Sequence, residues 1–161
     1  MAYGSNPKLA NPGAGKCEVL NRNLTGVGTI GFLKGEMVYS NAGVATVIGS
    51  GAVTGNLIFG QSLITDTTAV GQVTPCKVVS SDQLWKIKLI NNGTAAFASA
   101  FTVGTSYGMY VASNVHYADQ YVTSTYCMVR YVEPALQPGD AADGSDCSWG
   151  LFRFLDAVCE V

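Results

Sequence analysis

Short apolar runs separated by Gly, Asn, Ser and Thr make up most of this chain from residue 31 onward. This spacing is typical of an all-β protein, either a β-barrel or a β-sandwich, and long helical periods are missing. The clearest run covers residues 84–90, where three apolar side chains alternate with Lys86 and Lys88. Because successive side chains of a strand point to opposite faces, we predict that this strand buries its apolar set: Trp85, Ile87 and Leu89.

The other apolar runs predict a series of strands joined by turns. A first hairpin is expected from 32–39 to 44–48, because the break between them has the composition of a turn. A short helical turn is expected only around 95–100. We expect further strands over 57–64, 73–79, 107–111, 121–132 and 151–161.

Residues 1–28 differ from the rest, since they contain Pro7, Pro12 and several glycines but few large apolar side chains. We therefore predict an extended N-terminal arm over 1–28 and one β-barrel or β-sandwich domain over 29–161. An extended segment can add a strand to the sheet of a neighbouring chain. The arm is accordingly expected to bind a partner through Tyr3, Pro7, Leu9, Pro12, Val19 and Leu20.

Charged residues are scarce, at 12% of the 161 residues, whereas an average globular protein has about a quarter. We infer that other protein covers much of the surface. The formal net charge of -2 offers no basic field for nucleic acid and no polybasic patch for an anionic membrane. The first residues lack the pattern of a signal peptide, so we expect the chain to be made in a cytoplasm.

Catalytic chemistry has little support in the sequence. His116 is the only histidine and lies outside any nucleophile or metal signature, so we interpret it as a loop or surface residue. No Gly-x-Ser-x-Gly elbow and no phosphate-binding Gly-rich loop occur. We expect neither an enzyme nor a cofactor.

Two further groups of residues could carry chemistry. The loop 140–146 holds Asp140, Asp143 and Asp146, which we interpret as a solvated loop and not as a calcium site, because the alternate carboxylates of such a site are missing. Five cysteines, an odd number, are expected to be reduced and to pack as small apolar residues. They are Cys17, Cys76, Cys127, Cys147 and Cys159.

Six tyrosines gather in one quarter of the chain. Tyrosine suits both protein interfaces and sugar sites, because it combines a large ring with a polar tip. Filling of half-buried strand positions explains the same residues equally well. The six are Tyr107, Tyr110, Tyr117, Tyr121, Tyr126 and Tyr131.

The order of local patterns between residues 31 and 109 resembles the head decoration, or cement, proteins of tailed phages. The opening segment 30–39 is similar to their first strand, with its Lys-Gly-acidic turn and following Val. The segment 81–87 resembles their Asp-x-x-aromatic-x-aliphatic strand. Three more segments match in the same order: 41–45, 58–61 and 103–109.

This resemblance implies a β-barrel or β-tulip-like domain on the exterior of a virion. Such proteins cap junctions between subunits of the major capsid protein, commonly as homotrimers, and stabilise the shell. The resemblance supplies no catalytic, metal-binding or cofactor-binding residues. Two alternatives stay open: another virion or filament subunit of a tail, head fibre or minor capsid position, and a carbohydrate-binding β-sandwich that uses the tyrosines.

Overall fold

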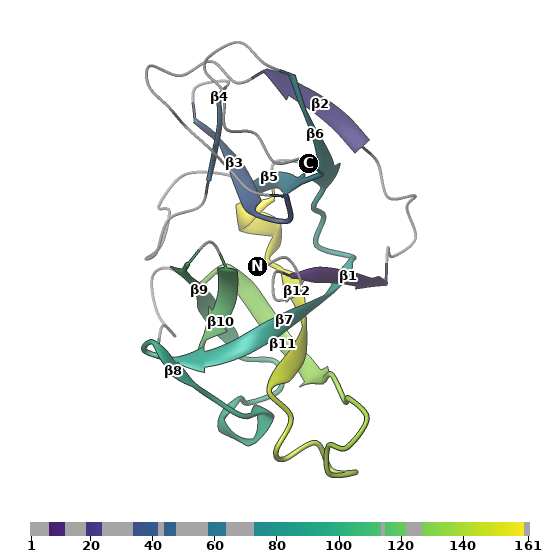
Figure 1. Ribbon diagram of the computed structural model, residues 1–161, viewed down its shortest axis with the longest axis vertical. Helices are drawn as coiled ribbons and strands as arrows, with labels where there is room; N and C mark the ends of the chain where they lie inside the picture. Colours follow the sequence, from purple (N-terminus) through teal and green to yellow (C-terminus); the bar gives the residue numbers. More distant parts are fainter. Residues whose placement is uncertain are drawn as a thin grey trace.

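The computed structural model describes residues 7–11, 19–23, 34–41, 44–47, 58–63, 73–113, 115–121 and 127–159. In these residues the chain is all-β and contains a closed five-stranded barrel. A second sheet of five strands lies above the barrel in Figure 1. The all-β barrel confirms the predicted fold class, and the separate second sheet was not predicted.

The barrel strands are β7 (Leu84–Asn91), β9 (Ser106–Ala112), β10 (Val115–Asp119), β11 (Val129–Pro134) and β12 (Trp149–Phe154). They follow the circular order β7-β10-β9-β11-β12, and the ring closes where β12 pairs with β7. The pair β7 and β10 is parallel, and the other barrel pairs are antiparallel. Closure removes most free edges from these strands.

The barrel interior contains the apolar set that the sequence predicts for β7. Trp85, Ile87 and Leu89 are buried. The Trp85 ring meets Phe154 edge-on with centroids 5.9 Å apart. Gly150 of β12 leaves space for two other core rings, because a Cβ there would lie 2.7 Å from the Phe152 ring and 2.8 Å from the Tyr131 ring.

The second sheet has the order β2-β6-β5-β3-β4 and is antiparallel throughout. The strands β3 and β4 form the predicted first hairpin. Their bounds and those of the other three are β2 (Val19–Asn23), β3 (Met37–Asn41), β4 (Val44–Val47), β5 (Ile58–Ser62) and β6 (Val73–Val78).

The link from β6 to the barrel is held by Gln83, which is buried. Its Oε1 accepts one hydrogen bond from Ser80 N and another from Trp85 Nε1, both at 3.1 Å. A single side chain therefore joins the connection to the barrel core, which fixes where β7 begins.

Three short elements complete the described structure. The strand β8 (Thr94–Ala95) folds back and pairs antiparallel with the end of β7 after a two-residue turn, in which Asn92 and Gly93 have φ of 45° and 83°. Positive φ at both positions is the requirement of this hairpin turn, and Asn and Gly adopt it at low cost. The others are two 3₁₀ turns, η2 (Ala98–Ala100), close to the expected helical turn, and η3 (Asp156–Val158).

The predicted N-terminal arm needs correction where the structure describes it. Within residues 1–28, β1 (Lys8–Asn11) pairs with β7 and β2 pairs with β6, so both strands belong to sheets of their own chain. The pairing of β1 follows from the length of β7, because β10 pairs only with Lys88–Ile90 along one edge of that strand. The segment β1 covers Leu84–Lys86 of that side and satisfies backbone groups that would otherwise stay open.

Three other sequence interpretations were wrong or incomplete. His116 lies in β10 and is fully buried, not in a surface loop. The last strand ends at Phe154, whereas the sequence predicted a strand over 151–161. The strand expected over 121–132 appears as β11, and Tyr121 lies in a turn after β10.

Candidate binding surfaces

The N-terminal residues that we expected to bind a partner have different positions. Pro7 is buried, and its carbonyl oxygen accepts a hydrogen bond from Gln61 Nε2 of β5, which also donates to Gly35 O at 2.9 Å. Leu9 is half-buried and packs against the core. Val19 and Leu20 lie in β2 opposite β6. Tyr3 and Pro12 lie outside the described residues.

Both N-terminal strands stand at the end of a sheet's strand order. The strand β1 is terminal in the sheet that contains the barrel, and β2 is terminal in the second sheet. An edge strand presents backbone N–H and C=O groups to which another chain can pair. These two edges are therefore candidate sites for strand addition.

Beside β1, two lysines share one tryptophan on the outside of the barrel. The ammonium Nζ atoms of Lys8 and Lys86 lie 5.7 and 5.2 Å from the centroid of the Trp149 ring. Burial lowers the pKa of Lys86 below its ordinary value, and the positive charge of Lys8 lowers it further. The tryptophan face compensates part of this repulsion through cation–π attraction.

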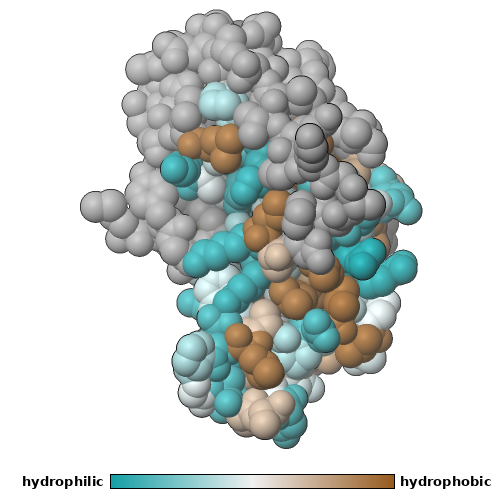
Figure 2. All heavy atoms as spheres, turned by 90° about the vertical axis from the view of Figure 1, so that its right-hand side faces the viewer, coloured by the Kyte–Doolittle hydropathy of each residue, from teal (hydrophilic) through white to brown (hydrophobic). Residues whose placement is uncertain are grey.

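On the face that Figure 2 draws, several hydrophobic patches lie among hydrophilic residues. Large apolar side chains that are themselves exposed occur at four positions in the part of the chain that the structure describes. They are Phe97, Val103, Tyr121 and Leu136.

The predicted tyrosine cluster does not form a single face. Tyr107 and Tyr131 are buried in the barrel core, as in the interpretation that tyrosines fill strand positions. Tyr110 and Tyr117 are half-buried and lie opposite each other on β9 and β10. Tyr121 is exposed, whereas Tyr126 lies outside the described residues.

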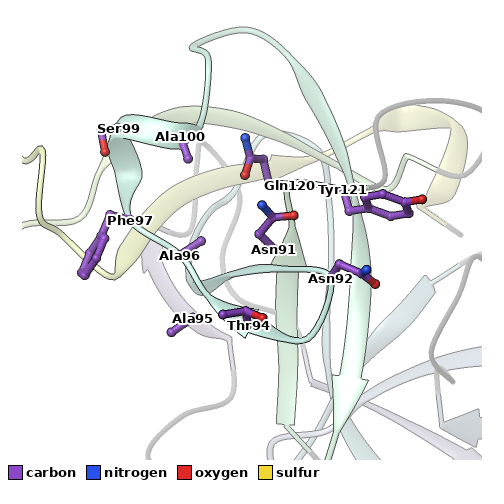
Figure 3. Close-up of a pocket in the computed structure, with 10 residues that line it drawn as sticks. All are labelled: Asn91, Asn92, Thr94, Ala95, Ala96, Phe97, Ser99, Ala100, Gln120 and Tyr121. Carbon is purple, nitrogen blue, oxygen red and sulfur yellow. The ribbon is translucent and has the colours of Figure 1, made fainter.

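A depression of about 570 Å³ lies between the β7–β8 turn, η2 and the end of β10. In Figure 3, Phe97 and Tyr121 stand at opposite ends of it, with the side chains of Asn91 and Gln120 between them. No charged side chain is among the described residues that line it. Sequence reasoning missed this site because its residues come from two separate segments, 91–100 and 120–121.

The acidic loop uses its carboxylates for turns. Asp140, Asp143 and Asp146 accept hydrogen bonds from the backbone N–H groups of Gln137, Ser145 and Ala141, at 2.7, 3.0 and 2.8 Å. The bond from Ser145 N holds the pKa of Asp143 below its ordinary value. This geometry agrees with the interpretation of a solvated loop.

Among the described residues, no group of three His, Cys, Asp or Glu side chains is placed to hold a metal ion. Four cysteines are free thiols, and three of these are buried, as the sequence predicts. The fifth, Cys17, lies outside the described residues. In the same part of the chain, no helix has the length and apolar character needed to cross a membrane.

Comparison with known proteins finds no family model, no curated protein and no solved structure that matches this chain.

Proposed function

We propose that this chain is a structural protein of a phage virion. It decorates the exterior of the capsid, binds at junctions between subunits of the major capsid protein as a homotrimer, and stabilises the shell. Assembly takes place in the host cytoplasm. The sequence resemblance to cement proteins suggests this role, and the all-β fold is compatible with it.

The observation that carries the proposal is the edge position of both N-terminal strands. A small protein can add capsid strands to these edges, and the backbone hydrogen bonds then hold it along several residues. The low charge of the chain fits the same role, because interface cores are depleted in charged residues.

The paired N-terminal strands change how this proposal is tested. Deleting residues 1–28 would remove β1 and β2 from their own sheets as well as from any partner, so loss of binding would be ambiguous. Ala10 is exposed on β1 and offers a smaller change. A charge on an edge strand opposes the addition of another strand.

The test is cosedimentation of purified protein with capsids from which the decoration has been removed. Ala10→Asp should bind about tenfold more weakly than the unchanged chain, with the same melting temperature. The matched control is Ala142→Asp, because Ala142 is exposed in the acidic loop. Equal binding of Ala10→Asp and the control would contradict an anchor on β1, and no binding by the unchanged chain would contradict the function itself.

A further inference from the structure

The depression between the β7–β8 turn, η2 and the end of β10 has an unusual chemical composition. Amide and hydroxyl groups line it together with two exposed aromatic rings, Phe97 at 53% exposure and Tyr121 at 70%. The polar side chains are Asn91, Asn92, Thr94, Ser99 and Gln120. Each of these amides and hydroxyls can both donate and accept a hydrogen bond.

The two segments that carry the polar lining residues, around Asn92 and Gln120, are joined by Asp119, which is 2% exposed. Its Oδ1 accepts hydrogen bonds from Asn92 N at 2.9 Å and from Tyr121 N at 3.0 Å. One buried carboxylate therefore fixes two backbone positions on separate segments of the lining. Gln120 N also donates to Ile90 O at 2.9 Å, which holds the same two segments together.

The other side of the depression is fixed by η2. Ala98 N donates to Cys147 O at 2.8 Å, and Ala98 itself is buried. Directly after η2, Phe101 enters the core and packs on Tyr107 with centroids 4.7 Å apart. The position of Phe97 at the start of this turn follows from these contacts. A site built on such supports loses little conformational entropy when it binds a ligand.

We propose that this depression binds a neutral oligosaccharide. Sugar hydroxyls donate and accept hydrogen bonds, as the amides of Asn91 and Gln120 and the Thr94 hydroxyl do. The faces of Phe97 and Tyr121 offer apolar platforms for the C–H faces of sugar rings. A charged ligand would find no opposite charge among the described residues of the lining.

A protein partner is the competing occupant, since exposed aromatics also occur at interfaces. The lining favours the saccharide, because amides and hydroxyls are dense over a small concave area and the two rings stand at its ends (Figure 3). This site is separate from the β1 and β2 edges on which the proposed function depends. The two proposals can therefore fail independently.

The experiment is a titration of ¹⁵N-labelled full-length protein, followed by backbone amide NMR shifts. The probes are maltotriose, cellotriose, chitotriose and mannotriose, each at about 10 mM, which is enough to occupy a site with millimolar Kd. At least one probe should shift amides of residues 91–100 and 120–121. Glycerol at the same concentration is the control for weak contact with any polyol.

Two variants then test the aromatic platforms. Phe97→Ala and Tyr121→Ala should each weaken the binding of the active probe about tenfold. Both side chains are exposed, so the fold should be unaffected. Val103→Ala is the matched control, because Val103 is 67% exposed in the loop after η2 and does not line the depression.

Several results would overturn the inference. They are no shift with any of the four probes, shifts confined to other residues, or equal shifts with glycerol. If no probe binds and the two aromatic variants lose capsid binding, the depression is instead part of a protein interface. In that case the proposed capsid function would stand without a saccharide site.

Discussion

Replacement of Trp85 is the most direct perturbation of the barrel. Its side chain is 0% exposed, packs edge-on against Phe154, and donates a hydrogen bond from Nε1 to Gln83 Oε1. Trp85→Ala removes the ring contact and the hydrogen bond, and it leaves a cavity in the core.

Truncation of a buried tryptophan to alanine costs about 3–5 kcal/mol of unfolding free energy. Trp85→Phe keeps most of the ring, so its cost comes mainly from the hydrogen bond to Gln83 and a small cavity, about 1–2 kcal/mol. The alanine loss is a large fraction of the 5–15 kcal/mol that stabilises a typical domain. We therefore expect a large fall in urea midpoint for alanine and a small one for phenylalanine.

Urea unfolding followed by fluorescence measures both variants. The second tryptophan, Trp149, is half-buried on the outside of the barrel and remains as the reporter. A loss below about 1 kcal/mol for Trp85→Ala, far under the usual cost of such a truncation, would refute the placement of Trp85 in the core. Equal losses for Ala and Phe would refute the division into packing and hydrogen bonding.

Three further predictions concern buried groups. Gly150→Ala should destabilise the barrel by about 1–3 kcal/mol in thermal unfolding, because its Cβ would approach the rings of Phe152 and Tyr131; an unchanged melting temperature would contradict this packing. Burial raises the pKa of Tyr131 to about 12, so its neutral form stabilises the fold fully below the unfolded pKa and this stability is lost as pH rises through the folded pKa. Phenolate absorbance should show a late step that accompanies unfolding and is missing in Tyr131→Phe, and an unchanged titration curve in that variant would refute the assignment. Burial raises the pKa of Cys159 to about 11, so its thiol should react with Ellman's reagent at about pH 8 far more slowly than Cys127, and equal rates would contradict its burial.

Local sequence patterns predicted the elements whose partners are near in sequence. Alternation identified β7 and its buried face, because Trp85, Ile87 and Leu89 are buried in the core. Lys86 and Lys88 lie on the other face of the strand and are only half-buried. The β3–β4 hairpin and the turn at η2 were also predicted correctly, since turn composition is a local signal.

Elements without a clear local pattern, or with distant partners, were missed, including β10, although it also forms a tight hairpin with β9. The strand β10 is buried at four of its five positions, so it has no alternation to detect, and its pairing with β7 is parallel and non-local. The role of β1 depends on the length of β7 that β10 leaves uncovered, which no local pattern encodes. The depression was not predicted for the same reason, because Asp119 joins two segments that are distant in the sequence.

We propose that this chain lies on the outside of a phage capsid. The most direct test is cryo-electron microscopy of virus particles purified from cells that carry the gene for this chain. We expect density for the barrel and its second sheet at junctions between major capsid subunits, with neighbouring protein paired to the edge of β1 or β2. Density for the chain only in the tail, or virions that lack it altogether, would contradict the claim.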